Sequence, residues 1–345
     1  MKRLLPLLIF SSIITHHLQA QSTCAQTLRT ARSTYDQGRL HELPVLLQAC
    51  LVNGFSDQEK VEAYKLLALA YIYLEEPTKA DEAMLNLLQT DSYFEINNTT
   101  DPAEFISLYK TFRTWPIYRV GAKIGVNASL PNTISRVNAV DGSQAEYSPN
   151  INFQSGVAFE IPLGKKIILN PELYFQLRSF LYTNNVALQN DVENTTEGRE
   201  KGTWISVPVS VQYLLNEKRF HPYVALGVSA DYLMNAEITL NRTRENATSV
   251  QQQTFTLSPQ RNAFNLGLVA SAGSKVKVGG GYITGELRFL YGLTAVNDES
   301  TAFTIDNNVL FDYGYADNYF KLNSISITFG YVYNVFSPKK LRNKK

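Results

Sequence analysis

The stretch Ser324-Ile325-Ser326-Ile327-Thr328-Phe329-Gly330-Tyr331-Val332-Tyr333-Asn334-Val335 decides how residues 116–336 of this chain fold. Every second residue from Ile325 to Val335 is apolar, and most residues between them are polar or small. This period of two is typical of a β-strand with one apolar face. Other segments repeat it, so we predict an eight-stranded antiparallel sheet from residues 117–129, 150–163, 167–182, 203–215, 221–236, 262–276, 281–295 and 320–336.

The connections between these strands indicate which face of the sheet points inward. Outer-membrane barrels have short turns at one end and long loops at the other, and soluble barrels have no reason for this alternation. Here short links at Gly164–Lys166, Asn216–Phe220 and Lys277–Gly280 alternate with long polar segments at 130–149, 183–202, 237–261 and 296–319. We therefore expect a transmembrane β-barrel over 116–336 whose apolar face contacts lipid.

The opposite face of the predicted strands carries small residues and a balanced set of charges. Small residues suit the tight interior of an eight-stranded barrel, which side chains just fill, so an open channel is not expected. Single buried ions would be prohibitively unstable. We predict a paired ion network in the lumen, and a solvated face with scattered charges is the alternative; the residues are Arg119, Lys123, Glu160, Glu172, Arg178, Asp231, Glu286 and Arg288.

Aromatic residues fall into two groups along the predicted strands. Aromatic girdles mark the two boundaries between lipid and water in membrane barrels. We expect one girdle near the short turns, from Tyr118, Tyr213, Tyr223 and Tyr333. The other is expected near the long loops, from Phe180, Tyr182, Tyr232, Tyr291 and Phe320.

The N-terminal part of the chain has a different organisation. Residues 1–20 combine a basic start, a short apolar run and a small residue at the expected cleavage site, which is the pattern of a signal peptide. From 21 to 115, apolar residues recur every three or four positions, which predicts a helical domain. The helices are expected at Thr27–Tyr35, Leu43–Leu51, Val61–Leu74, Ala80–Leu88 and Ala103–Phe112, and a basic tail occupies 337–345.

Cys24 and Cys50 are the only cysteines in the chain. If helices at about 24–36 and 41–52 pair antiparallel across Gly38, the two cysteines lie level with each other. An exported protein meets an oxidising environment, so we predict a disulfide that closes this hairpin. Two buried thiols are the alternative.

Composition argues against several classes of function. The chain has 345 residues with 32 Lys+Arg against 31 Asp+Glu, so it lacks the basic surplus of a nucleic-acid-binding protein. Outside the leader only His41 and His221 remain, about 180 residues apart. No nucleophile–His group, metal-ligand spacing or phosphate loop is present in the sequence. We predict a non-enzymatic protein with no catalytic residues, metal or cofactor.

The helical segment resembles a tetratricopeptide repeat (TPR) in Leu67-Ala68, Ala70-Tyr71, Ala80, Ala83-Met84 and Leu87-Leu88. It departs at Glu75, where the family usually has Gly, and at Pro77; a plain helical bundle is the alternative. In either version we expect a domain that binds another protein. An even number of barrel strands returns both ends of the barrel to one side, so we expect this TPR-like domain in the periplasm together with the tail. Candidate docking residues are Tyr64, Tyr71, Tyr73 and Met84.

The barrel segment resembles the PorT-like outer-membrane β-barrel family of Bacteroidota. The resemblance lies in Trp204–Val209, His221–Gly227 and Glu286–Leu293. Residues Thr328, Gly330, Tyr333 and Val335 resemble the terminal signal read by the barrel-assembly machinery, although here a basic tail follows Phe336. Some relatives serve the type IX secretion system, and the helical domain is not part of the family's basic pattern.

These resemblances imply an α+β, two-domain protein of a Gram-negative outer membrane, with its helical domain and C-terminus in the periplasm. We expect a scaffold whose helical domain docks a periplasmic or outer-membrane protein of a secretion (type IX-like) or envelope-assembly machine. The other expected partners are outer-membrane lipid and, during biogenesis, the assembly machinery. The alternative is a surface-binding or adhesion barrel that acts through its long loops.

Overall fold

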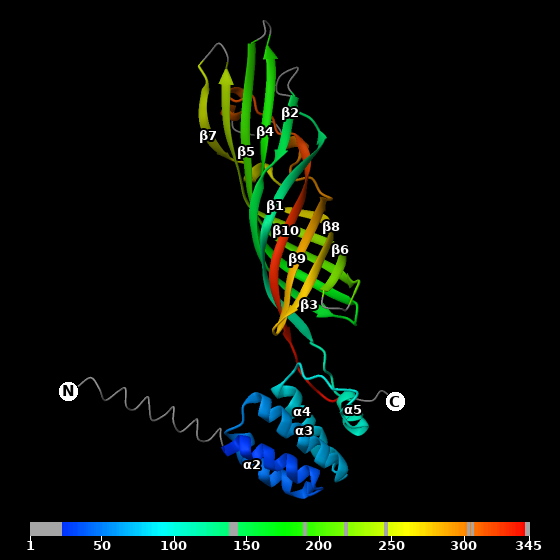
Figure 1. Ribbon diagram of the computed structural model, residues 1–345. Coiled ribbons are helices and arrows are strands. Elements are labelled where there is room, and N and C mark those ends of the chain that lie inside the picture. Colours follow the sequence, from blue (N-terminus) through cyan, green and yellow to red (C-terminus); the bar gives the residue numbers. More distant parts are fainter. Residues whose placement is uncertain are drawn as a thin grey trace, which may run out of the picture. The chain divides into compact units, whose positions relative to one another are not determined.

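A computed structural model describes residues 23–137, 144–188, 192–216, 220–244, 248–301, 304 and 307–341. The chain forms two compact units, one from 1–116 together with 336–345 and the other from 117–335 (Figure 1). The predicted signal peptide and residues 342–345 of the predicted tail lie outside the described residues.

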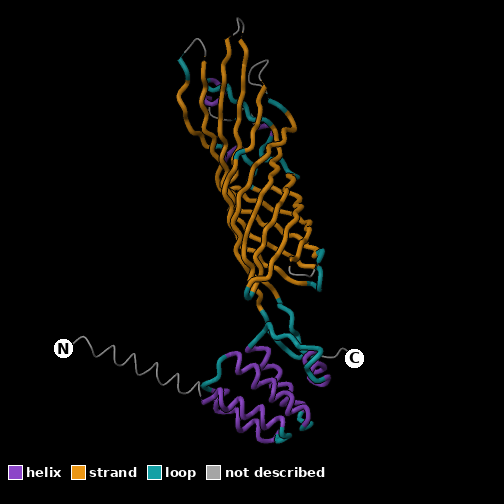
Figure 2. The backbone as a smooth tube through the Cα atoms, in the orientation of Figure 1, coloured by secondary structure: helices purple, strands orange, loops and turns teal. Residues whose placement is uncertain are grey.

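The first unit is helical, with helices where the three- and four-residue spacing predicts them (Figure 2). A helix over residues 23–36 leads into the short 3₁₀ turn η1 (Leu40–Glu42). The helices α2 (Leu43–Val52), α3 (Asp57–Tyr73), α4 (Pro77–Thr90) and α5 (Ala103–Lys110) follow. No helix in the described part of the chain is both long and apolar enough to cross a bilayer.

Local signals set the ends of the α3–α4 hairpin. Ser56 caps α3, because its hydroxyl accepts the Glu59 amide while the Glu59 carboxylate accepts the Ser56 amide. Glu75 takes the left-handed conformation, with φ of 58°, in the turn where the repeat family usually has Gly. Pro77 stands at the first position of α4, where its missing amide does no harm. Both departures of the sequence from the repeat pattern therefore fall in this turn.

A disulfide joins Cys24 of the first helix to Cys50 of α2. Both residues are buried within the core of the helical unit. Gly54 lies directly against Cys24 with φ of 140°, and a Cβ at this position would approach Cys24 Sγ to 2.5 Å. Glycine is therefore required where the chain passes the disulfide.

Loss of the disulfide should destabilise the helical unit. The bond closes a segment with a sequence separation of 26, for which chain-entropy arguments give about 3 kcal/mol. We expect the double variant Cys24→Ser/Cys50→Ser to lose helix signal at lower temperature in far-UV circular dichroism of the full chain in detergent. Reduced wild-type protein should behave in the same way, and equal melting of the oxidised, reduced and variant chains would contradict this expectation.

The second unit is a closed antiparallel β-barrel. Its wall runs in the order β1 (Tyr118–Ser135), β3 (Ile151–Pro162), β4 (Ile167–Leu188), β5 (Val192–Leu214), β6 (Phe220–Arg244), β8 (Phe264–Val278), β9 (Gly281–Gly292) and β10 (Tyr319–Val335). The barrel closes where β10 pairs with β1, from Tyr118 opposite Val335 onward. We call the end with the β3–β4, β5–β6 and β8–β9 links the turn end, and the opposite end the loop end.

Among the residues that the structure describes, the sheet has ten strands, two more than the sequence predicts. The short strands β2 (Gln144–Pro149) and β7 (Val250–Thr256) lie in segments predicted to be loops, and pair with β4 and β6. The predicted loops 183–202 and 237–261 are also largely strand, because β4, β5 and β6 continue far beyond the lipid-facing zone (Figure 1). Outside the lipid, strands can pair without an apolar face. A period-two pattern in the sequence therefore does not reveal these strand extensions.

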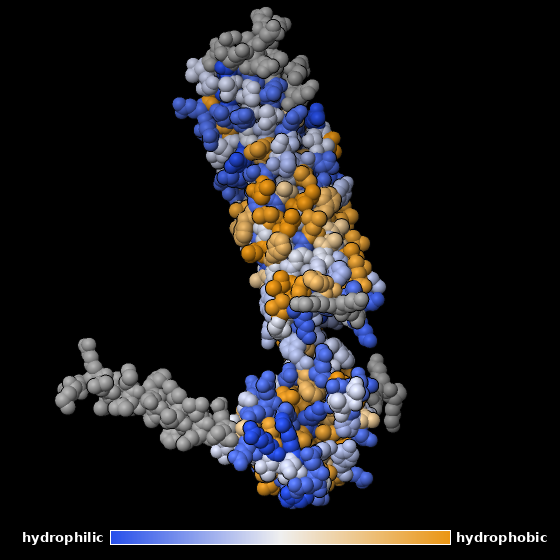
Figure 3. Space-filling view, viewed as in Figure 1, coloured by the Kyte–Doolittle hydropathy of each residue, from blue (hydrophilic) through white to orange (hydrophobic). Residues whose placement is uncertain are grey.

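The apolar face of the barrel points outward, as predicted. On β10, Ile325, Ile327 and Phe329 are 43%, 45% and 62% exposed, whereas the alternate residues Ser324, Ser326 and Thr328 are buried. Hydrophobic residues gather over the middle and turn end of the barrel, and hydrophilic residues dominate toward the loop end (Figure 3). This outward apolar belt suits a hydrocarbon solvent.

Candidate functional site

The lumen at the turn end holds one buried carboxylate between two cations. Glu160 of β3 accepts from Arg119 of β1 at 3.1 Å and from Lys275 of β8 at 2.6 Å. Lys275 also donates to the Gln212 side-chain oxygen at 2.6 Å. Lys275 is absent from the predicted network, although it shares the strand face of Gly273 and Ser271, so its period-two position could have identified it.

The middle of the lumen contains a four-residue ion cluster. Lys123 donates to Glu172 at 2.5 Å and approaches Glu286 at 3.2 Å. Arg288 bridges the same two carboxylates, with its contact to Glu286 at 2.6 Å. The Tyr223 hydroxyl also donates to Glu286, at 2.7 Å. All five side chains are buried, so each carboxylate is paired with more than one donor inside the barrel.

A third pair lies closer to the loop end. Arg178 of β4 donates to Asp231 of β6 at 2.8 Å and to Gln176 at 2.5 Å, and its guanidinium lies over the Trp204 ring at 5.1 Å. With this pair and the two groups above, every residue of the predicted ion network forms an ion pair across the barrel interior. The network fills the lumen with paired charges and hydrogen bonds.

Beyond these ions, the barrel interior becomes apolar. Phe180, Tyr182, Phe320 and Trp204 pack inside the loop end with Tyr315. The other members of this core include Ile238, Leu240, Phe255, Leu257, Val296, Val309, Tyr313 and Leu322. The predicted girdles are therefore wrong in part: Phe180, Tyr182 and Phe320 face inward, and so does Tyr223 at the turn end. Tyr213, Tyr333, Tyr232 and Tyr291 are exposed on the outer surface.

A buried arginine holds three segments together at the loop end. Arg261, which follows the 3₁₀ turn η2 (Ser258–Gln260), donates through two nitrogens to Glu200 at 2.8 and 2.7 Å. It also pairs with Asp317, which accepts from Asn297 at 3.0 Å. Burial raises the pKa of Glu200 more than the Arg261 guanidinium lowers it. Burial alone would lower the pKa of Arg261, but Asp317 and Glu200 raise it well above its usual value.

Sequence reasoning missed this Arg261 cluster. Its members come from segments predicted to be polar loops, where single charged residues give no periodic signal. Only the strand extensions of β5 and the return of the chain before β10 bring them together.

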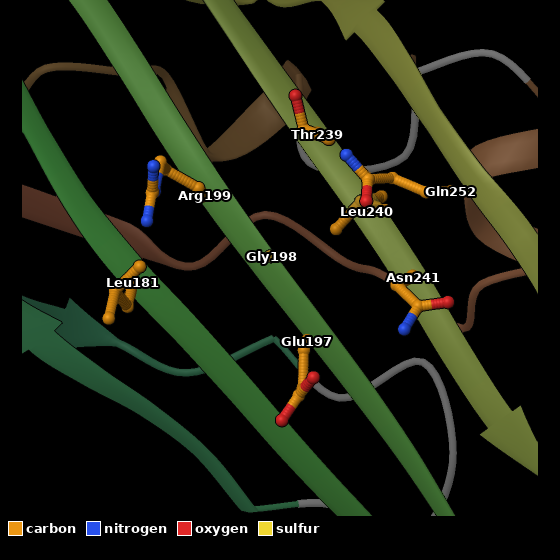
Figure 4. Close-up of a pocket in the computed structure, with 8 residues that line it drawn as sticks. All are labelled: Leu181, Glu197, Gly198, Arg199, Thr239, Leu240, Asn241 and Gln252. Atoms are coloured by element: carbon orange, nitrogen blue, oxygen red, sulfur yellow. The ribbon is translucent and has the colours of Figure 1, made fainter.

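A shallow polar groove of about 390 Å³ lies on β4, β5, β6 and β7 at the loop end (Figure 4). Four planar polar side chains line it, namely Glu197, Arg199, Asn241 and Gln252, together with Thr239, Gly198, Leu181 and Leu240. Thr239 bonds to Thr254 of β7 at 2.9 Å. Among the described residues, no group of three or more His, Cys, Asp and Glu side chains is placed to hold a metal ion.

The predicted docking residues of the helical unit differ in accessibility. Tyr73 is 49% exposed, whereas Tyr64 and Tyr71 are partly buried against the core. Met84 has no exposed surface, so its prediction as a docking residue is wrong; its side chain fills the core of the helical unit instead.

The residues of the predicted assembly signal lie on β10 against β1. Thr328 is buried opposite Gly125, and Gly330 lies opposite Lys123. Tyr333 is 52% exposed on the outer face opposite Val120, and Val335 lies opposite Tyr118.

Comparison with known sequences places the barrel in a family. The sequence model described as "Outer membrane protein beta-barrel domain" matches residues 117–298, which is more than half of the chain. The chain belongs to this family. Its barrel is therefore embedded in the lipid of an outer membrane, in agreement with the outward apolar belt. No curated protein sequence matches the chain.

Several solved outer-membrane structures are similar to this chain. Neisserial surface protein A is 12% identical with a TM-score of 0.29, and the match covers 63% of this chain and 96% of that one. OprG of Pseudomonas aeruginosa is 13% identical, with a TM-score of 0.32 and coverage of 64% and 98%. The attachment invasion locus protein Ail of Yersinia pestis is 10% identical, with a TM-score of 0.27 and coverage of 62% and 97%.

A charge on the outer belt should destabilise the barrel. Leu226 of β6 is 71% exposed, and lipid-facing Arg in the middle of a membrane barrel costs about 2–4 kcal/mol. We expect Leu226→Arg to lower the free energy of unfolding by this amount in urea titrations in lipid vesicles. Val45→Arg is the matched control, because Val45 is 78% exposed on the helical unit and should tolerate the charge. Equal effects of the two substitutions would contradict a lipid-facing belt.

Removal of the central lysine should leave two carboxylates with too few partners. We expect Lys123→Met to destabilise the barrel by about 3–5 kcal/mol, because breaking a buried pair leaves uncompensated charge. The shift in urea midpoint and the temperature at which the folded band converts on gels measure this loss. Ile124→Val is the control, since the adjacent side chain is 59% exposed on the lipid face. A Lys123→Met midpoint equal to that of the control would refute the expectation.

The Arg261 cluster gives a pH-dependent expectation. Arg261→Gln leaves Glu200 and Asp317 buried without their cation, which should cost about 3–5 kcal/mol at neutral pH. Without the Arg261 cation, burial would hold the pKa of Glu200 still further above its value in the unfolded chain, so the variant's stability should fall as pH rises through that folded-state pKa. Glu200→Gln should cost less, because burial already raises the pKa of Glu200. The free energy of unfolding, measured at pH 5 and pH 8, tests both variants. A loss of stability in Arg261→Gln that is larger at pH 5 than at pH 8 would contradict this account.

Proposed function

We propose that the protein is a non-enzymatic outer-membrane scaffold whose helical unit docks a protein partner in the periplasm. One observation carries this proposal: the residues before β1 and those after β10 together form a helical unit with its own core and disulfide. The two ends of the barrel chain, the start of β1 and the finish of β10, meet at the turn end. Short turns face the periplasm in barrels of this kind, so the proposal assigns the helical unit and the C-terminus to that compartment.

The chemistry of the helical unit supports this compartment and role. The Cys24–Cys50 bond suits an oxidising environment outside the cytoplasm. The α3–α4 hairpin buries small residues, including Ala63, Ala70, Ala80 and Ala83, as TPR-like hairpins do. The barrel contains a closed set of ion pairs without needing this unit, which supports a separate task for it.

Tyr71 and Tyr73 at the end of α3 form the proposed docking surface. Tyr73 is half exposed, and Tyr71 is partly buried with Lys79 over its ring at 5.5 Å. Exposed tyrosines supply a large contact area together with a polar hydroxyl, and aromatic residues are enriched where proteins bind one another. Residues 21–115 carry 13 acidic and 8 basic groups, so the domain is net acidic by five charges.

The resemblance of the barrel strands to PorT-like proteins of Bacteroidota supports a secretion (type IX-like) or envelope-assembly machine as the partner's source. On this proposal the barrel-assembly machinery reads Thr328, Gly330, Tyr333 and Val335 on β10 before the barrel closes. The helical unit is an addition to that family's pattern.

Affinity purification of the full chain in mild detergent, after cross-linking in cells, tests the docking role. We expect a stoichiometric envelope protein that is lost in Tyr73→Glu and retained in Val52→Glu, because Val52 on α2 is exposed (70%, against 49% for Tyr73) but lies outside the proposed docking surface. A barrel that elutes alone after cross-linking, or a partner that Tyr73→Glu retains, would contradict the proposal.

The groove of Figure 4 favours a second candidate function, ligand binding at the cell surface through the loop end. Glu197, Arg199, Asn241 and Gln252 present hydrogen-bonding groups from three adjacent strands in this groove. The same purification separates the two functions. A partner or adhesion phenotype lost in Arg199→Ala/Asn241→Ala but unaffected by Tyr73→Glu would favour surface binding.

A further inference from the structure

The segment that follows the last barrel strand belongs to the helical unit. The Arg113 amide donates to the Lys339 carbonyl at 2.9 Å, and the Leu341 amide donates to the Thr111 carbonyl at 2.7 Å. Phe112 and Lys340 form an antiparallel bridge between these two bonds. Residues 339–341 thus pair with 111–113, directly after α5, through one isolated antiparallel bridge and its two main-chain hydrogen bonds.

Side chains attach the same segment to the unit at three other places. The Phe336 ring meets the Tyr93 ring edge-on, with centroids 4.8 Å apart. Arg113 Nε donates to the Ser337 carbonyl at 3.1 Å, and Lys340 pairs with Asp81 of α4. Phe112, which lies opposite Lys340, is buried in the core of the helical unit. We call residues 336–341 the C-terminal strap.

The strap pairing is separate from the barrel ladder. The last barrel bond at this end is that of the Ile117 amide to the Val335 carbonyl, at 2.9 Å. Pairing resumes at Arg113 and Lys339. Each intervening stretch contains a proline, Pro116 in one and Pro338 in the other, and proline has no amide to donate. The strap therefore needs its own contacts, because a continuous sheet does not hold it in place.

We propose that the C-terminal strap is a closing element, which completes the helical unit only after the entire barrel chain has been made. Residues 23–116 of the unit are synthesised first, yet the segment that pairs with 111–113 comes from residues that follow β10. The end of the unit after α5 reaches its final form when the strap binds 111–113. If the docking role proposed above holds, the partner meets a finished unit only on a chain that extends through residues 336–341.

Hydrogen exchange of the full chain in detergent micelles tests the strap without any partner. The readouts are the Arg113 amide, which the strap protects, and amides of α3 as an internal reference. We expect a chain truncated after Phe336 to exchange Arg113 at least tenfold faster than wild type, with α3 unchanged. Heat-modifiable migration on gels shows whether each variant has assembled its barrel.

If the truncated chain does not assemble its barrel, substitutions that keep the C-terminal strap test the same proposal. Leu341→Pro removes the amide that bonds to Thr111 and should speed Arg113 exchange, whereas Leu341→Ala keeps this amide and should not. Lys340→Ala removes the exposed ion pair alone and should have a small effect. Arg113 exchange that stays within twofold of wild type in Leu341→Pro would overturn the strap, and it would do so whether or not a partner docks at Tyr73.

Discussion

The hydrocarbon of the membrane cannot hydrogen-bond to a polar group, and the rest of the barrel follows from this constraint. Every main-chain group at that depth must be paired, so β10 returns to β1 and leaves no open edge. Every charge must turn inward and find an opposite charge there. The cluster of Lys123, Arg288, Glu172 and Glu286 satisfies this requirement at the centre of the lumen.

Where the same strands leave the lipid, their apolar side chains point into the barrel instead of outward. Along β6, Leu226 faces outward in the lipid zone, whereas Ile238 and Leu240 face inward beyond it. The interior changes accordingly from ion pairs to an aromatic core, with Arg261 as its buried polar tie. A single barrel wall therefore encloses two interiors of opposite character, each matched to the solvent outside it.

The lipid zone could be predicted from the sequence because its pattern is strict. The alternation in Ser324–Val335 identifies both the strand and its two faces, and the charged residues of the polar face point to the lumen. The helices were predictable for the same reason, and their antiparallel pairing across Gly38 indicated the Cys24–Cys50 pair. Lys275 also follows this pattern, because it lies on the same strand face as Ser271 and Gly273, although it was not among the predicted network residues.

The loop end could not be predicted because no single periodicity describes it. Segment 193–200 is polar on both faces, so its pairing in β5 leaves no trace in the residue pattern. Phe180, Tyr182 and Phe320 have the composition of a membrane girdle, and only their tertiary surroundings show that they form a core. Met84 illustrates the same limit, since an apolar helix residue can serve a surface or an interior.

The division of the helical unit between the two ends of the chain has a mechanical consequence. In chain order the barrel is an insertion within that unit, because 1–116 precede it and 336–345 follow it. A surface protease that cuts one connection at the loop end would leave two fragments, each holding part of the barrel wall and part of the helical unit. Neither fragment could leave without separating paired strands, so a nicked molecule would keep its helical unit.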